Sequence, residues 1–228
     1  MSDQVVPEIK TISILGGTGK EGKGLAYRWA KAGYRIVIGS RQAEKAQTAA
    51  ESIRELFDHT VNVEGVPNPE AAQQGDIIVM TVPFNAHVAM LEGIKPYVQG
   101  KIFIDVSVPL VPPKVTKVQM PEAGSAAQEA QQILGENVSV VAAFQNISYE
   151  NLLKDEEVGC DILVCGTGKA NRQVVLNLVK DAGLIGWDAG VIENSVVVEG
   201  LTSILIGLNK QYGVEASGIR ITGINRTE

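Results

Sequence analysis

A glycine-rich turn between an apolar strand and a helix constrains the fold of this chain more than any other feature. Residues 16–22 read GGTGKEG and follow the short apolar run Thr11–Leu15. Gly17, Gly19 and Gly22 satisfy the pattern G-x-G-x-x-G. The first glycine of this pattern permits a tight turn, the second lets the backbone approach a pyrophosphate, and the third lets the helix pack on the strand. Because the free amides of that helix would face the phosphates, we predict dinucleotide binding here; the alternative is a plain glycine-rich turn.

Strand-like and helix-like periods alternate along the first 143 residues. Helices are predicted at residues 21–32, 42–57 and 123–134. Strands are predicted at residues 11–15, 35–38, 61–64, 76–82, 101–106 and 138–142. This alternation favours right-handed crossovers and a parallel sheet with helices on both faces. We therefore expect an α/β fold built on a Rossmann-type, doubly wound parallel sheet.

The pattern changes after Phe144, where a second unit is predicted. It contains strands at 161–165 and 184–188, a helix at 170–182, and a long apolar helix at 194–212. That last helix is apolar almost all round, so it should be buried against the first unit or against a second subunit. We expect a nucleotide-binding domain at 1–143 and a smaller C-terminal α/β domain at 144–228, which closes the crevice and dimerises.

The bulk properties are those of an ordinary globular chain with an acidic balance. Of its 228 residues 45% are hydrophobic and 20% charged, and the net charge is −6. This charge argues against nucleic acid or an anionic membrane as the main partner. Residues 1–10 lack signal-peptide features, and no apolar run reaches the roughly 18 residues that span a bilayer. Cys160 and Cys165 are predicted to be buried and unpaired, so we expect a cytoplasmic protein.

The end of the second predicted strand indicates which nicotinamide cofactor is bound. An acid at this place would accept the ribose 2′-hydroxyl of NAD and repel a 2′-phosphate. Ser40 and Arg41 stand here instead, and Lys45 follows one helical turn later. A hydroxyl, a guanidinium and an ammonium suit a phosphate, so the pattern favours NADP. The alternative is that Arg41 and Lys45 only solvate the start of a helix.

Three loops at the carboxyl ends of strands are expected to form the reaction crevice, because ligands of such sheets bind there. They read TVPFNAH (81–87), DVSVPLVPP (105–113) and AAFQNIS (142–148), and proline-rich apolar loops suit a flat ring. Thr81, Asn85 and Asn146 are candidates for the few polar contacts.

Acid–base chemistry has little support in the sequence. His87 falls inside a probable helix and is interpreted as a packing or surface residue, and His59 as exposed. Asp105 could be catalytic, but a carboxylate that fixes its loop is the preferred interpretation. No metal-ligand cluster and no paired carboxylates are found, so we predict no metal and name no catalytic residue. Simple hydride transfer fits this picture, because the cofactors carry that chemistry.

Several segments together resemble the NADPH-dependent coenzyme F420 reductases, also called F420H2:NADP oxidoreductases. Residues 12–46 are similar to the start of that family, with its GGTG loop and G-S-R segment. The segments 81–87, 109–112 (PLVP) and 188–202 (DAGVIENSVVVEGLT) resemble later parts of it. The sequence departs from the family pattern at Gln145, where the pattern has histidine, and at Phe84, where it has tryptophan. The resemblance implies a Rossmann domain with a small C-terminal domain, in a homodimer.

The resemblance also implies which residues bind the cofactors. Carried over, the pyrophosphate would be cradled by Thr18, Gly19, Lys20 and Glu21. The 2′-phosphate would be held by Ser40, Arg41 and Lys45. The nicotinamide would be flanked by Thr81, Val82 and Pro83. The deazaflavin crevice would be lined by Ala143, Gln145, Asn146 and Ile147. The opposite wall would be formed by Asn194, Ser195, Leu201 and Thr202.

The expected function is thus that of an NADP-dependent oxidoreductase, with NADP and coenzyme F420 as its substrates. Hydride would pass between C4 of NADP(H) and C5 of the deazaflavin ring in a ternary complex. Two alternatives remain open at this point. One is an NADPH-dependent reductase of a flavin or of a small imine or ketone, and the other is a non-catalytic NADP(H)-sensing protein.

Overall fold

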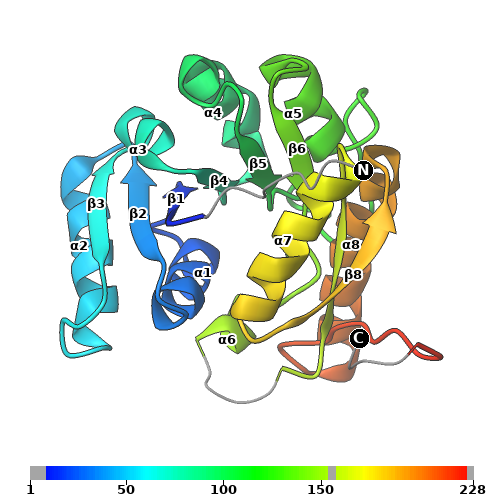
Figure 1. The fold of residues 1–228 in the computed structure, drawn as a ribbon. Helices are drawn as coiled ribbons and strands as arrows, with labels where there is room; N and C mark the ends of the chain where they lie inside the picture. The colour runs from blue at the N-terminus through cyan, green and yellow to red at the C-terminus, as the bar shows by residue number, and fades with distance from the viewer. Residues whose placement is uncertain (1–8, 154–157, 225–228) are drawn as a thin grey trace.

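A single eight-stranded sheet runs through the computed structural model, which describes residues 9–153 and 158–224. The segment 1–8, in which no signal peptide is predicted, lies outside the described residues. The strands are β1 (Thr11–Leu15), β2 (Arg35–Ser40), β3 (Val63–Pro67), β4 (Ile77–Met80), β5 (Ile102–Asp105), β6 (Ser139–Ala142), β7 (Asp161–Gly166) and β8 (Ile185–Gly190). They lie in the order β3-β2-β1-β4-β5-β6-β7-β8, from one side of Figure 1 to the other.

Helices pack on both faces of this sheet. They are α1 (Lys20–Lys31), α2 (Ala43–Glu55), α3 (Asn68–Gln74), α4 (His87–Ile94), α5 (Ala126–Leu134), α6 (Tyr149–Leu152), α7 (Lys169–Asp181) and α8 (Ser195–Tyr212). Three short 3-10 helices are η1 (Phe84–Ala86), η2 (Lys95–Tyr97) and η3 (Ile192–Asn194). The strands predicted from the sequence all form, whereas α3 and α6 are not among the predicted elements.

The topology confirms the expected Rossmann-type, doubly wound sheet. Strands β1 to β6 are parallel, and the order reverses between β1 and β4. Such a reversal opens a crevice beyond the carboxyl ends of the strands. β7 then runs antiparallel to β6, with Ala142 opposite Cys165, and β8 is parallel to β7. The C-terminal part therefore extends the same sheet, and the boundary at 143/144 stays a prediction.

Alternation along the strands divides the core into two layers. Ile12 and Ile14 of β1 point into a layer that α1, α2 and α7 cover. Leu15 of β1 joins the other layer, which α3, α4 and α5 cover together with Val198 of α8. Successive side chains of a strand point to opposite faces, so strands that are apolar throughout are buried on both.

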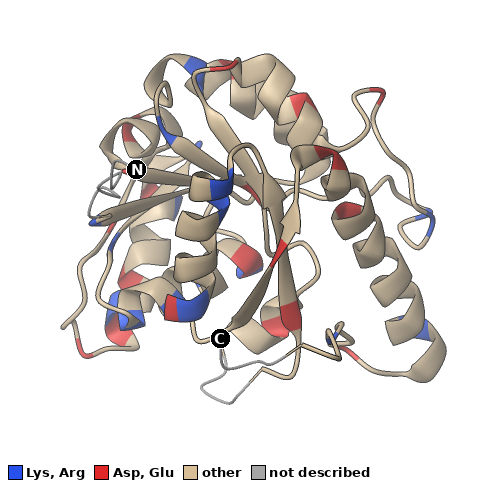
Figure 2. Ribbon diagram, turned by 45° about the vertical axis from the view of Figure 1, so that its right-hand side comes forward, with Lys and Arg blue, Asp and Glu red and all other residues tan. Residues whose placement is uncertain are grey.

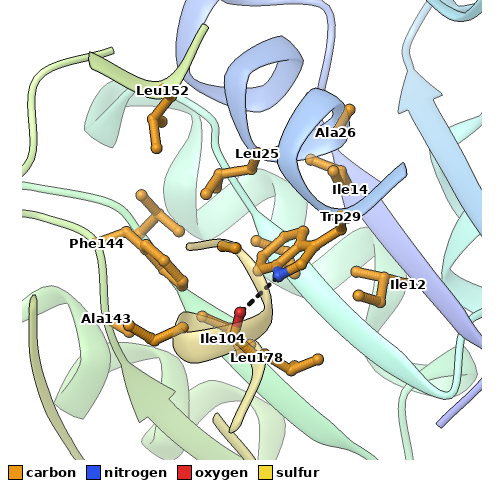
Figure 3. Close-up of a cluster of buried hydrophobic side chains, with 14 of the residues drawn as sticks. Ile12, Ile14, Leu25, Ala26, Trp29, Ile104, Ala143, Phe144, Leu152 and Leu178 are labelled. Carbon is orange, nitrogen blue, oxygen red and sulfur yellow. Dashed lines mark hydrogen bonds between the residues drawn. The ribbon is translucent and has the colours of Figure 1, made fainter. Parts of the chain in front are cut away.

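Helix α1 joins the two parts of the chain (Figure 3). Trp29 is fully buried, meets the ring of Phe144 edge-on at 5.6 Å, and donates its indole N–H to the carbonyl of Leu178 at 2.9 Å. Arg28 donates to the carbonyls of Leu152 at 2.7 Å and Ala182 at 3.2 Å. Because buried aromatic area and satisfied polar groups both stabilise such a contact, α1 is held firmly against Phe144, Leu152 and α7.

The long helix α8 is only half covered. Its buried residues are Ser195, Val198, Glu199, Gly200, Ser203 and Leu205. Its exposed apolar side chains are Val196, Val197, Ile204, Leu208 and Tyr212. The expectation that this helix is buried against the rest of the chain is therefore confirmed for one face only.

Candidate functional site

The three glycines of the phosphate-binding pattern differ in what surrounds them. A Cβ on Gly17 would lie 2.7 Å from the carbonyl oxygen of Ile14, and one on Gly22 would lie 2.5 Å from Cα of Gly17. A Cβ on Gly19 would meet nothing within 4 Å. Gly17 also donates its backbone N–H to the carbonyl of Gly39 at 3.1 Å. The turn is therefore closed by Gly17 and Gly22, and Gly19 leaves open space at the start of α1, where a pyrophosphate would be placed.

Asn68 braces this loop from the end of β3. It is buried, and its Oδ1 accepts the backbone N–H of Gly16 at 3.1 Å. The close approach also explains Gly39, since a Cβ there would lie 2.6 Å from Oδ1 of Asn68. Asn68 is not among the site residues predicted from the sequence. Its signal was the Asn-Pro pair, which follows a strand and begins α3.

The end of β2 presents two unpaired cations. Ser40 is buried as the last residue of the strand, and its Oγ accepts the backbone N–H of Gln42 at 3.3 Å. Arg41 and Lys45 are exposed, and neither makes an ion pair within the described ranges. A guanidinium and an ammonium without partners beside a phosphate-binding loop are a suitable arrangement for a second phosphate.

A cavity of about 600 Å³ lies beyond β4, β5 and β6. Eight of the predicted cofactor-binding residues line it, namely Glu21, Thr81, Val82, Pro83, Gln145, Asn146, Ile147 and Thr202. Their loops leave different strands, and the parallel topology brings them to one edge of the sheet. The cavity is thus continuous with the start of α1, which contributes Glu21.

The remaining walls of the cavity come from several segments. The loop after β5 contributes Val106, Ser107, Val108, Leu110, Pro112 and Val115. One face of α8 contributes Thr202, Leu205, Ile206 and Asn209. Further contacts come from Phe84, Phe144, Ser148, Tyr149, Glu215 and Ser217. Of these α8 residues only Thr202 was predicted from the sequence, although their spacing of three and four is that of one helix face.

Several predicted site residues lie elsewhere. Ala143 is fully buried in the core. Asn194 donates to the carbonyl of Ala189 at 2.6 Å, and the hydroxyl of Ser195 lies 2.6 Å from that of Ser125. Leu201 is half-buried on α8. These four, and the exposed Asn85, are not among the residues that line the cavity.

Two amides of the loop after β6 are fixed by their NH₂ groups. Nε2 of Gln145 donates to the carbonyl of Asp105 at 2.7 Å, and Nδ2 of Asn146 donates to that of Asp161 at 2.6 Å. Thr202 of α8 donates its hydroxyl to the carbonyl of Gln145 at 2.7 Å. The amide oxygens of both side chains are buried and accept no hydrogen bond from the described residues. The wall therefore holds two unused acceptors.

Phe144, in the same loop after β6, has an unusual backbone conformation. Its φ is +74°, a left-handed conformation that a bulky residue rarely adopts. The residue is held there because its ring is buried against Trp29. Local strain of this kind is found at ligand sites, where surrounding packing maintains it.

One carboxyl oxygen of Glu21 is buried without a hydrogen-bond partner among the described residues. The residue is half-buried as a whole and lies in the first turn of α1, but its Oε1 is fully buried. Burial raises the pKa of its carboxyl to about 8. A lone buried carboxyl prefers its neutral form, since ionisation in a region of low polarity is costly.

A second group of ionisable residues is closed off from the cavity. His87 is fully buried between two carboxylates, with Nε2 at 2.8 Å from Asp105 and Nδ1 at 2.8 Å from Glu129. Burial lowers the pKa of His87, but the hydrogen bonds and charges of Asp105 and Glu129 outweigh it and leave the pKa raised. Asp105 also accepts the backbone N–H of Ser107 at 2.8 Å. It therefore fixes its loop, as the preferred interpretation held, and His87 is a packing residue.

Among the described residues there is neither a helix able to cross a membrane nor a group of three or more potential metal ligands. Cys160 and Cys165 are buried and free, as predicted.

Comparison with known proteins places the chain in a family. Residues 11–109 match the family described as NADP oxidoreductase coenzyme F420-dependent. F420-dependent NADP reductases from Methanocaldococcus jannaschii and Methanothermobacter thermautotrophicus are 38% and 39% identical to it. The alignments cover 93% and 96% of this chain and 98% of each relative.

A solved structure supports the fold. A protein from Arthrobacter sp. FB24, provisionally assigned as an F420-dependent NADP reductase, superposes with a TM-score of 0.79 at 21% identity. It covers 94% of this chain and 99% of its own. The resemblance seen in the sequence is confirmed by these relatives, and the chain belongs to the family of F420-dependent NADP reductases.

Proposed function

We propose that this protein catalyses hydride transfer between NADP(H) and the deazaflavin coenzyme F420. The observation that carries the proposal is the mostly apolar cavity that begins at Glu21 beside the phosphate-binding loop and continues between β4, β6 and α8. Its position would bring a nicotinamide ring and a second flat ring together in one enclosed space. The family relatives, which are named F420-dependent NADP reductases, support the choice of the second ring.

NADP(H) is proposed as the nucleotide because of the end of β2. The open space at Gly19 would receive the pyrophosphate, on the free amides of α1. Arg41 and Lys45, together with the hydroxyl of Ser40, would hold the 2′-phosphate. Each charge-assisted hydrogen bond to that phosphate contributes about 1.5–3 kcal/mol.

The residues of the chain position the reactants and exclude water. Thr81, Val82 and Pro83 would flank the nicotinamide, while Gln145 and Asn146, held in place by their NH₂ groups, would form the wall beside it. The bound cofactors supply the hydride chemistry itself. Holding two rings face to face lowers the barrier through proximity, because the reaction then becomes effectively unimolecular.

The direct test follows the deazaflavin absorbance after purified protein is mixed with NADPH and oxidised F420. Bleaching is expected with NADPH, and NADH should be at least tenfold less effective, since about 1.4 kcal/mol corresponds to a tenfold change. A variant that combines Arg41→Ala with Lys45→Ala should raise KM for NADPH and leave the weak reaction with NADH unchanged. Equal rates with NADPH and NADH would contradict the assignment of the 2′-phosphate site.

The same assay separates the alternatives. Parallel reactions contain FMN, or a small cyclic imine, in place of F420. Turnover with one of these acceptors and none with F420 would show that the second substrate is a flavin or an imine and not the deazaflavin. Binding of NADPH with no turnover of any acceptor would instead favour an NADP(H)-sensing protein, in which the exposed face of α8 binds a partner.

We also propose a homodimer formed through α8. Val197, Ile204, Leu208 and Tyr212 are spaced along one side of the helix, and between 37% and 68% of each side chain is exposed. The sequence of α8 has no charged residue between Glu199 and Lys210, and the ribbon of this helix is tan along most of its length in Figure 2. An uncharged apolar stripe of this kind is typical of an interface between subunits.

Two further proposals concern the cellular location of the protein and the class of its substrates. We propose that it works in the cytoplasm, which the two free cysteines and an intracellular nicotinamide cofactor support. Its net charge of −6 supports small molecules as substrates in preference to nucleic acid.

A further inference from the structure

Glu21 is an unusual residue to find beside a nicotinamide. It lies at the x position before the third glycine of the phosphate-binding loop, and its side chain forms part of the cavity wall with Thr81, Val82 and Pro83. In the proposed function these three residues flank the nicotinamide ring. Glu21 therefore borders the space proposed for the reacting ring, so its role can extend beyond the pyrophosphate.

The charge of the nicotinamide ring changes during the reaction. The ring is neutral in NADPH and carries a positive charge in NADP⁺, because the hydride takes two electrons with it. In a cavity of low polarity, a cation formed beside a carboxyl group favours the ionised carboxylate, and a neutral ring favours the protonated acid. A carboxyl that has no other partner responds most strongly to such a change.

The other charged groups around Glu21 leave it available for this role. Lys20 donates to the hydroxyl of Tyr149 at 3.0 Å, lies 4.4 Å from the centre of that ring, and is 4.0 Å from Glu150. Neither it nor Lys23 forms a salt bridge with Glu21 in the structure described. Across the cavity the ionisable residues are Tyr149 on α6 and Glu215 after α8, and Asp105 is occupied by His87.

We propose that Glu21 changes its protonation state with the redox state of the bound nicotinamide, protonated beside NADPH and ionised beside NADP⁺. The inference rests on the proposed function. When hydride leaves NADPH, the ring gains one positive charge and Glu21 loses one proton, so the net charge of the cavity wall and ring stays constant. The released proton balances the one that a reduced deazaflavin takes up with the hydride. In the reverse direction Glu21 takes a proton back as the ring becomes neutral.

This coupling makes the affinity for the two nucleotides depend on pH in opposite ways. The free protein holds Glu21 with a pKa of about 8. NADP⁺ should bind more tightly as pH rises toward 8, with release of a proton, and NADPH should bind more weakly as pH rises above 8. Between the pKa values of the two complexes, the ratio of the two dissociation constants should change by about tenfold per pH unit.

The test measures binding of NADP⁺ and of NADPH by calorimetry between pH 7 and pH 9, in two buffers with different ionisation enthalpies. The difference between buffers gives the number of protons exchanged. Wild type should release up to one proton with NADP⁺ below pH 8. Glu21→Gln keeps the shape of the side chain but cannot ionise, so it should exchange no proton and show a constant ratio of dissociation constants.

Glu55→Gln is the matched control, since Glu55 is an exposed acid at the end of α2 and should leave the proton exchange of wild type unchanged. Proton release that persists in Glu21→Gln would overturn the inference. A second measurement needs no variant: the ¹³C carboxyl signals of glutamate in wild type are titrated without ligand, with NADP⁺ and with NADPH. One glutamate whose pKa is lower with NADP⁺ than with NADPH is expected, and identical titrations would overturn the inference.

The two proposals can fail separately. If the wild-type protein binds neither nucleotide, both the proposed function and this inference are wrong. Wild type that reduces F420 with NADPH, yet shows no proton linkage to nucleotide binding, would end this inference alone.

Discussion

At the residue scale, the glycines of the phosphate-binding loop separate the requirements of folding from those of binding. The space around Gly19 is empty, and its φ of −74° is open to any residue. Gly19→Ala should therefore cost only about 1 kcal/mol of stability, as expected for alanine at a helix N-cap. It should nevertheless raise the dissociation constant for NADPH at least tenfold, because the added methyl group would occupy the place of the pyrophosphate.

Gly22→Ala serves as the contrasting variant. Its Cβ would lie 2.5 Å from Cα of Gly17, so the loop must shift, at a cost of about 3 kcal/mol. Urea denaturation and fluorescence titration of NADPH measure the two effects. Equal losses of stability in Gly19→Ala and Gly22→Ala would contradict the different roles of the two glycines.

The stability of the protein without ligand should depend on pH through Glu21. The pKa of this carboxyl is raised above its ordinary value of 4.5 to about 8. The folded state therefore binds the proton more tightly than the unfolded state does, and wild type loses stability as pH rises from 4.5 to 8. Glu21→Gln cannot ionise and keeps this stability. Its free energy of unfolding should therefore rise by at least about 1 kcal/mol relative to that of wild type between pH 5 and pH 9. Urea denaturation at both pH values measures this; a constant difference would show that the carboxyl is ionised without penalty.

The residues predicted for the nucleotide half of the site come mostly from local sequence motifs, and those of the crevice half do not. Gly19 and Arg41 belong to contiguous motifs whose chemistry is local, so their spacing predicts their roles, whereas Glu21 was assigned by resemblance. The cavity wall of α8 depends on how a distant helix docks, which no local pattern encodes. Asn194 and Ser195 illustrate the difference, because they were assigned to the wall by resemblance and lie outside the cavity lining.

At the scale of elements, the buried histidine connects three of them. His87 begins α4, Glu129 lies on α5 and Asp105 ends β5, so His87→Ala would leave the buried carboxylate of Asp105 facing the partly buried carboxylate of Glu129. Removal of one partner of a buried ionic group costs about 3–5 kcal/mol. His59→Asn, at an exposed position, should change stability by less than about 0.5 kcal/mol.

The loss of stability caused by His87→Ala should become smaller as pH rises. The raised pKa of His87 means that its stabilising contribution is complete below its ordinary value of 6.5 and is lost as pH rises through the folded-state value. Thermal and urea denaturation at pH 6 and pH 9 compare the two limits. A penalty that grows toward pH 9 would show that the histidine is neutral in the folded protein.

The strands were predictable from sequence and two of the helices were not. Runs such as Ile77–Met80 are apolar without interruption, which is typical of a strand buried on both faces. α3 and α6 have only seven and four residues, too few to show an apolar period. They form because tertiary contacts hold them, as Asn68 holds the phosphate-binding loop and Leu152 packs on α1.

At the scale of the whole molecule, the proposed dimer can be broken on α8. Val197→Lys combined with Ile204→Lys would place two charges in the apolar stripe, and burying them in an interface is unfavourable. Sedimentation velocity should show a dimer for wild type and a monomer for this variant. Val88→Lys, on α4, is an exposed control that should stay dimeric. A monomeric wild type would contradict the dimer.

Helix α1 has a consequence for the kinetics of binding. Its first turn carries the nucleotide loop, and further along the same helix Arg28 and Trp29 are hydrogen-bonded to the part of the chain that walls the other side of the cavity. The proposed sites of the two substrates are thus both attached to α1. We therefore expect the gap between donor and acceptor to be set when the chain folds, with no closing motion before transfer. Stopped-flow traces of NADPH binding should accordingly be single exponentials whose rate rises linearly with concentration, and a plateau would reveal a hidden rearrangement.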